Sequence, residues 1–283
     1  MDYTTFDLTI ADGIAHIRLN RPDALNTMTP AFWVELPAAI RDIDDNARAR
    51  VIVISSTGKH FTAGMDLAVF GSGAPSGGAD TTNERGRVAA NLRLRVLDIQ
   101  NSFNVIEAAR MPVLAAIQGG CVGGGVDLAS ACDCRYATAD AFFVIQEINI
   151  GMTADVGTFP RLCNLMPTGM VRELAYSGRR LSATKAMQLG LVNEVFDSHE
   201  AMLAEVMAIA RDIAEKSPLA VYGSKVMINY ARDHSVADGL DYIATWQAGM
   251  YNPAVDMAES FRARKEKRSP QFDELLPIKR RGG

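Results

Sequence analysis

Three carboxylates accompany a glycine-rich stretch in the middle of this 283-residue chain. The stretch covers 118–128 (QGGCVGGGVDL), and the acids are Asp127, Glu147 and Asp155. Carboxyl groups in different environments can remove a proton at one atom and deliver one at another. The consecutive glycines 123–125, between an apolar strand and a predicted helix, let a ligand approach unpaired backbone N–H groups that bind an anion or a developing oxyanion. The stretch therefore suggests proton chemistry beside an oxyanion site.

Each of these features also has an ordinary structural explanation. Asp127 could serve as a helix-dipole partner, Glu147 as a surface acid at a strand end, and Asp155 as a helix N-cap. The glycines could form a packing turn. A dinucleotide fingerprint G-x-G-x-x-G is excluded, because Leu128 stands where the third glycine is needed.

The elements that must position these acids alternate between strand and helix. Short β-type runs at 6–10 and 14–19 flank Asp12-Gly13, which predicts a hairpin, and the continuous apolar run 51–54 predicts a strand buried on both faces. Alternation continues to about residue 197. Further predicted elements are a helix from Thr29-Pro30 to about Asn46, a long helix through Leu92 and Ile106, a strand at 112–117, and helices at 199–216, 218–232, 235–250 and 254–267.

Composition narrows the class of protein. The chain is 48% hydrophobic and 22% charged, with a formal net charge of −4, which gives no overall electrostatic reason to bind nucleic acid or a membrane. No apolar run approaches the roughly 20 residues that span a bilayer, and no secretory leader is visible. Four cysteines are too few for a disulfide framework and lack zinc-site spacing. We expect a cytoplasmic protein without metal or separate cofactor.

Several motifs together resemble one known superfamily over nearly the whole chain. The similarity is to the crotonase (enoyl-CoA hydratase/isomerase) superfamily, and within it most to the Δ3,5-Δ2,4-dienoyl-CoA isomerases. The superfamily motifs are Ala115-x-x-Gln118-Gly119-x-Cys121-x-Gly123-Gly124-Gly125-x-Asp127-Leu128 and the upstream FTAGMDL at 61–67, and the subgroup motifs are CDCRY at 132–136, DAFF at 140–143 and DVGT at 155–158.

This resemblance implies an architecture. The implied fold is the α/β crotonase (ClpP/crotonase-like) spiral of ββα units followed by a C-terminal helical region. Residues 1–197 would form the spiral core with the coenzyme A site and the catalytic acids, and 198–283 would form a helical oligomerisation region. The implied assembly is a homotrimer or a dimer of trimers, a homohexamer.

The acids decide the subgroup. Hydratases of the superfamily carry two glutamates at the positions matched by Asp127 and Glu147, which position the attacking water. The dienoyl isomerases instead resemble this chain in the aspartate at 127, the glutamate at 147 and the extra aspartate at 155. The implied reaction is isomerisation of 3,5-dienoyl-CoA to 2,4-dienoyl-CoA in the β-oxidation of unsaturated fatty acids.

The resemblance and the chemistry of this reaction assign a role to each acid. A proton must leave the α-carbon and another must reach the ε-carbon. Glu147 matches the position near the α-carbon and is expected to be the base, whereas Asp155 would protonate the ε-carbon and Asp127 would orient or charge-balance Glu147. Asp155 must then be protonated in the resting complex, with a pKa raised by burial and by neighbouring carboxylates.

Backbone and tail residues complete the implied site. The backbone N–H groups of Met65 and Gly124 would form the oxyanion hole. The coenzyme A portion of the substrate would lie against Ala63, Gly64, Met65, Asp66, Leu67 and Gly124, with Lys267 of a basic tail cluster as a further contact. That cluster, which comprises Arg262, Arg264, Lys265, Lys267 and Arg268, could equally be a solvated helix face.

Two other functions remain open at this stage. One is an enoyl-CoA hydratase that adds water to a 2-enoyl-CoA through Asp127 and Glu147. The other is a non-catalytic or RNA-binding relative, which the acidic pI of about 5.6 and the intact acids argue against.

Overall fold

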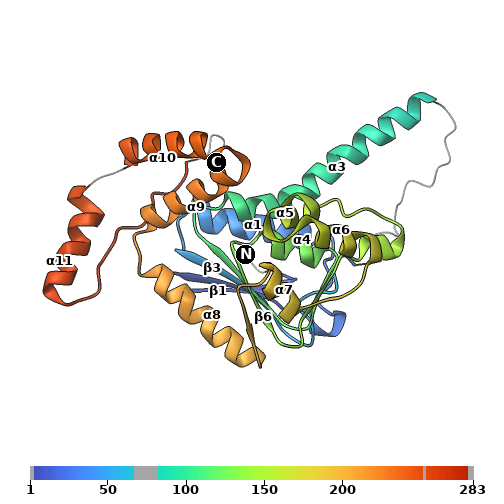
Figure 1. Cartoon of the computed structure of the whole chain (residues 1–283), viewed down its shortest axis with the longest axis horizontal. Coiled ribbons are helices and arrows are strands. Elements are labelled where there is room, and N and C mark those ends of the chain that lie inside the picture. The colour runs from blue at the N-terminus through green and yellow to red at the C-terminus, as the bar shows by residue number, and fades with distance from the viewer. Residues whose placement is uncertain (1–2, 67–81, 251–252, 280–283) are drawn as a thin grey trace.

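A six-stranded sheet forms the centre of the protein. The computed structural model describes residues 3–66, 82–250 and 253–279 (Figure 1). The strand order is β1-β2-β3-β4-β6-β9; β1 and β2 form an antiparallel hairpin, and all other neighbours are parallel. The strands are β1 Phe6–Ala11, β2 Ile14–Leu19, β3 Val51–Ser56, β4 Val113–Ile117, β6 Cys134–Thr138 and β9 Glu194–Phe196.

Both faces of this sheet are covered, which explains the continuous apolar runs in β3 and β4. Alternate side chains of a strand point to opposite faces. Ile52 and Ile54 of β3 belong to the larger core with α1 (Phe32–Asp45) and α4 (Gly124–Ala131). Val51 and Val53 pack with residues of α8 (His199–Ala214) on the other face.

A smaller sheet lies across the ends of the parallel strands and creates the spiral. It contains β5 (Gly120–Val122), β7 (Phe142–Val144) and β8 (Leu181–Ser182), and a bridge between Thr62 and Cys121 extends it. The chain passes from β4 to β5 to α4, and then from β6 to β7 to the helical turn at Glu147–Ile150. Each of these two turns of the spiral therefore contributes one strand to each sheet before its helix.

The remaining helices lie around this core and beyond it. α5 (Thr158–Leu165), α6 (Thr168–Ser177) and α7 (Ala183–Leu189) follow β7, and every described element after β9 is helical. These are α8, α9 (Pro218–Asp233), α10 (Val236–Met250), the turn at Pro253–Met257 and α11 (Ala258–Glu266). In Figure 1, α11 and much of α10 extend away from the sheet, as does the N-terminal half of α3 (Thr82–Ala108).

Local patterns predicted most of these elements. The opening hairpin, the buried strand at 51–54 and the long helix ending near Ile106 are confirmed. The predicted helix start at Thr29-Pro30 is wrong: α1 begins at Phe32, because Met28 is drawn into a β-bridge with Met65 and the chain turns once more before the helix. The division into two domains at 197 stays a prediction.

Candidate active site

The glycines at the start of α4 allow three segments of chain to meet. Gly123 has φ +53° and ψ −120°, a conformation that side-chain-bearing residues avoid. A Cβ on Gly125 would lie 2.6 Å from the Thr62 side chain, and one on Gly124 would lie 2.9 Å from the Met28 sulfur. Glycine permits these close contacts, so the run 123–125 forms a junction between α4 and the segments that carry Met28 and Thr62.

Two backbone N–H groups at this junction remain available. Gly64 packs so closely that an added Cβ would lie 2.6 Å from the Val122 carbonyl oxygen and 3.5 Å from the Gly124 nitrogen. The next residue, Met65, therefore lies near the first residue of α4. Within the described chain, neither the Met65 nor the Gly124 N–H has an intramolecular acceptor. These are the two N–H groups expected to form an oxyanion hole.

Asp127 is a fully enclosed carboxyl held by one neighbour. Its residue is 1% exposed, and its Oδ1 accepts hydrogen bonds from the Thr158 N–H at 2.6 Å and the Thr158 hydroxyl at 2.7 Å. Its Oδ2 is buried without a partner among the described residues. Burial raises the pKa of Asp127 to about 6, although both Thr158 hydrogen bonds favour the anion.

Glu147 lies over the start of α4. Its Oε1 is 3.2 Å from the position that a Cβ on Gly123 would occupy, and its Oε2 is buried with no partner in the described part of the protein. Burial, reinforced by the negative charges of Asp127 and Asp155, raises the pKa of Glu147 to about 7. A carboxylate with such a pKa is well matched to remove protons near neutral pH.

Asp155 differs from the other two acids because it remains open to solvent. It lies on the segment 154–158 before α5, and it lines a cavity of about 590 Å³ between this segment, α3 and the end of α9. Partial burial raises the pKa of Asp155, opposed by its own backbone N–H. The three acids form one electrostatic group, since Asp155 also raises the pKa values of Asp127 and Glu147.

The structure places the other expected binding residues unequally. Ala63, Gly64, Met65 and Asp66 lie together beside α4; the Ala63 N–H donates to the Leu25 carbonyl, and the Asp66 N–H donates to the Met28 carbonyl. Leu67 lies outside the described residues.

Among the described residues, Lys267 is the one expected binding residue that the chain does not bring to the site. It is the exposed C-cap of α11 with φ +53°, and α11 is well separated from α4 in Figure 1. Two members of the basic cluster, Arg262 and Arg268, pair with Glu259 of α11. Within one chain, the tail cluster therefore lies away from the acids.

Sequence reasoning missed the side chains that hold the acids in place. Thr158 belongs to the DVGT motif, yet nothing in its spacing indicated that both its N–H and its hydroxyl bind Asp127. Arg161, on the same helix, is 8% exposed and pairs with Glu107, 54 residues earlier. A buried arginine leaves no local sequence signal, because its partner comes from a distant helix.

The described residues contain no group of three or more histidine, cysteine or acidic side chains arranged to hold a metal ion. In residues 3–66, 82–250 and 253–279, no helix combines the length and apolar character needed to cross a membrane. All four cysteines are free.

Comparison with known proteins gives a consistent family. Residues 9–275 match the family model described as enoyl-CoA hydratase/isomerase. A mitochondrial Δ3,5-Δ2,4-dienoyl-CoA isomerase of Mus musculus is 44% identical over 94% of this chain and 81% of its own length. A peroxisomal isomerase of the same name from Arabidopsis thaliana is 42% identical over 93% of both chains.

A solved structure agrees on the fold. An enoyl-CoA hydratase from Bacillus anthracis is 28% identical and superposes with a TM-score of 0.83, covering 98% of this chain and 100% of the other. The expected spiral of ββα units with helices at its C-terminal end is confirmed.

The expectation of a cytoplasmic protein is wrong. The related isomerases are named as mitochondrial and peroxisomal proteins. The expectation rested on composition, which describes the folded domain and does not distinguish one compartment from another.

Proposed function

Because the chain belongs to the enoyl-CoA hydratase/isomerase family, we propose that it is a Δ3,5-Δ2,4-dienoyl-CoA isomerase whose three acids work as follows. The substrate is a 3,5-dienoyl-CoA of unsaturated fatty acid oxidation. The product is the conjugated 2,4-dienoyl-CoA. Coenzyme A is part of the substrate, and the reaction uses no separate cofactor.

Glu147 removes the proton from the α-carbon. Its pKa of about 7 leaves a substantial fraction of the carboxylate ionised at neutral pH, and its buried, unpartnered Oε2 is poorly solvated. Loss of the α-proton moves negative charge onto the thioester oxygen. Glu147 is therefore the group that starts the reaction.

The Met65 and Gly124 N–H groups stabilise the resulting enolate. They are unpaired in the described chain and lie on two segments that Gly64 brings into contact. Donors fixed in advance at a developing charge lower the barrier, because they do not reorganise during the reaction. Removing one such donor typically costs on the order of 10²–10³ in kcat.

Asp155 delivers the second proton to the ε-carbon, and the double bonds shift toward the thioester. Asp155 must carry its proton when the substrate is bound. Its pKa is already raised in the free protein, and an acyl chain that displaces water from the adjoining cavity raises it further. Asp127 keeps the pKa of Glu147 high through its charge.

The observation that carries this proposal is the position of Glu147 over the start of α4. A base and an oxyanion donor then lie side by side, because Gly123 places no side chain between them. The family resemblance alone assigns the residues. The local geometry explains why that arrangement can do enolate chemistry.

The test is turnover of a 3,5-dienoyl-CoA, followed by the absorbance of the conjugated product. We expect isomerisation by the native protein, and a fall of about 10²–10⁴ in kcat for Glu147→Gln and for Asp155→Asn with little change in folding. Water addition to a 2-enoyl-CoA is measured beside it. Near-native turnover by both variants would refute these roles, and fast hydration without isomerisation would make the protein a hydratase.

We further propose that the protein is a homotrimer or a dimer of trimers. Large apolar side chains are exposed on the outlying elements, including Leu92 and Leu94 of α3, Leu240 of α10 and Phe261 of α11. Such surfaces usually mark a contact with another chain. In such an assembly Lys267 would reach the coenzyme A of a neighbouring subunit.

A further inference from the structure

A buried arginine lies beneath the segment that carries Asp155. Arg161 is in the first turn of α5, and its side chain turns back over the start of that helix. Its Nη1 lies 3.4 Å from the Val156 carbonyl oxygen, to which it donates a hydrogen bond. A Cβ on Gly157 would lie only 1.8 Å from the same nitrogen. The guanidinium thus fills the space that any side chain at 157 would need.

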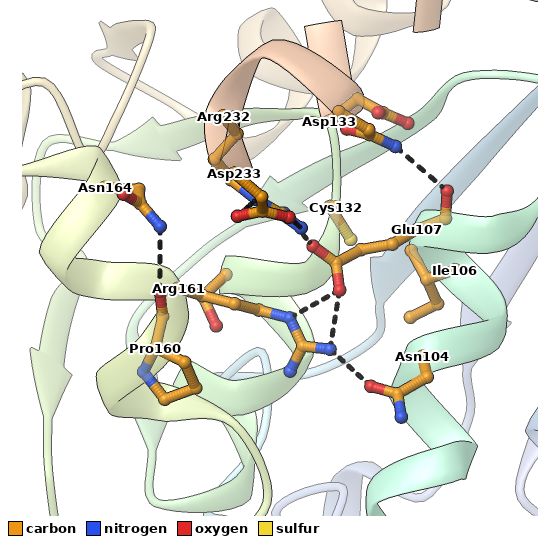
Figure 2. Close-up of polar contacts among 12 residues, drawn as sticks. Asn104, Ile106, Glu107, Cys132, Asp133, Pro160, Arg161, Asn164, Arg232 and Asp233 are labelled. Atoms are coloured by element: carbon orange, nitrogen blue, oxygen red, sulfur yellow. Dashed lines mark hydrogen bonds and ion pairs between the residues drawn. The ribbon is translucent and has the colours of Figure 1, made fainter. Parts of the chain in front are cut away.

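This arginine is fastened to α3. Its Nε and Nη2 donate to Glu107 Oε2 at 3.0 and 2.7 Å, and its Nη2 also donates to Asn104 Oδ1 at 2.7 Å (Figure 2). The other carboxylate oxygen of Glu107 accepts a hydrogen bond from Arg232 Nη1 of α9 at 2.6 Å. Glu107 therefore joins α5 to two helices that are distant in sequence.

The segment that Arg161 supports serves two of the three acids. Asp155 lies two residues before Gly157, and its backbone carbonyl accepts a hydrogen bond from Gln100 of α3 at 2.6 Å. Thr158, directly after Gly157, supplies both hydrogen bonds to Asp127 Oδ1. Displacement of the turn at 157 would move the Asp155 carboxyl and loosen the Asp127 carboxyl together.

The charge of Arg161 also acts on one of these acids. It lowers the pKa of Asp127, opposing the effect of burial. The charged groups that line the cavity with Asp155 are Arg161 of α5, Glu107 of α3, and Arg232 and Asp233 of α9. Asp127 and Glu147 are the acids whose pKa values the charge of Asp155 raises. Among the groups that line the cavity, Arg161 is the cation that contacts the backbone of the segment itself.

We propose that Arg161 is a positioning residue for the isomerase, which fixes the turn 155–158 against α3 and thereby sets the placement of Asp155 and Asp127. This inference rests on the proposed function. It assigns a role in the reaction to a side chain that need not touch the substrate. It also makes α3 and α9 part of the support of the acids.

The test compares three variants that separate the charge from the position. Arg161→Gln removes both the cation and the forked pairing; Arg161→Lys keeps the charge without the fork. Gly157→Ala keeps the arginine but displaces it from the turn, since the added Cβ meets the guanidinium and the φ of +130° suits only glycine. Each is measured for kcat, KM and the pH dependence of kcat with 3,5-dienoyl-CoA.

We expect kcat to fall about 10- to 100-fold in all three variants, with KM within about 3-fold of the native value, as for a misplaced catalytic group. Loss of the cation raises the pKa of Asp127, whose charge acts on Glu147, so only Arg161→Gln should change the acidic limb of the profile. Arg161→Lys and Gly157→Ala should keep the native limb.

Arg179→Gln is the matched control, because it removes an exposed cation that pairs with Glu173 outside this cavity and leaves the Arg161 pairing intact. It should keep kcat within about 3-fold. Turnover of Arg161→Gln and Gly157→Ala within 2-fold of the native rate would overturn the proposal, and so would a fall in kcat that only matches a loss of folded protein on thermal melting. If the native protein itself does not isomerise the substrate, the proposed function fails instead.

Discussion

The charge of Asp127 raises the pKa of Glu147, the proposed base. The pKa of Asp127, about 6, and that of Glu147, about 7, are both raised chiefly by burial. The charge of Asp155 raises both pKa values further, and the charge of Asp127 also raises that of Glu147. Coupled carboxyls titrate as a group, so a rate profile reports values that belong to the group. In the proposed mechanism, the charge of Asp127 is therefore part of what sets the pH range of activity.

A pH profile of Asp127→Asn tests this coupling. In the native protein, kcat/KM should fall as the pH drops below about 7, because Glu147 becomes protonated and can no longer accept the α-proton. Asparagine can still accept the Thr158 hydrogen bonds but carries no charge, so the pKa of Glu147 should fall. The acidic limb should then move to lower pH, measured between pH 5 and 9 by the product absorbance.

The same experiment has a clear negative outcome. An unchanged acidic limb in Asp127→Asn would mean that the charge at 127 does not act on the base. A shift to higher pH would contradict the sign of the coupling. Thermal melting of both proteins at each pH controls for loss of fold.

At the scale of elements, the junction of α4 with the loop at 62–66 and with Glu147 depends on glycines that accept no Cβ. Gly123 combines a conformation closed to other residues with a carboxylate oxygen 3.2 Å from the position of its missing Cβ. A helix start of this kind depends on a backbone conformation that is strained for residues other than glycine. Function and local stability are therefore linked at this position.

Gly123→Ala should affect both activity and stability. Backbone strain at such a residue costs of order 1–3 kcal/mol, and the added methyl group displaces Glu147. We expect a clear fall in the denaturant midpoint and a loss of about 10²-fold or more in kcat. The control is Gly169→Ala on α6, where an added Cβ meets nothing within 4 Å. Equal effects at the two positions would contradict this account.

At the scale of the whole molecule, one chain leaves much apolar surface uncovered. Leu240 is 62% exposed and Phe261 is 60% exposed, both on helices that extend from the core. An isolated chain with such extensions would be poorly stabilised, because few of these side chains leave water. The proposed assembly would cover them.

Sedimentation equilibrium tests the assembly. We expect a mass three or six times the 30.6 kDa of one chain. Phe261→Asp and Leu240→Asp should lower that mass by placing charges on the buried contact, whereas a change at Glu215, exposed at the end of α8, should not. A native protein that sediments as a single chain would exclude both proposed assemblies.

The sequence alone determined the features that depend on short stretches of chain. Apolar runs and period-two alternation identified the hairpin and the buried strands, and helical spacing identified α3 and the C-terminal helices. The types and spacing of Asp127, Glu147 and Asp155 carried the resemblance to the dienoyl isomerases. The compartment was not among these features, because nothing in a folded domain's composition records it.

Only the tertiary structure decided how those acids differ. Two of them have an oxygen that is enclosed with no partner among the described residues, while Asp155 stays open to solvent. A pKa depends on that burial more than on residue type. The unpaired N–H groups of Met65 and Gly124 meet because Gly64 lets two distant loops touch. Arg161 pairs with Glu107, 54 residues earlier in the chain. Such contacts arise when the whole chain packs, so no local pattern can specify them.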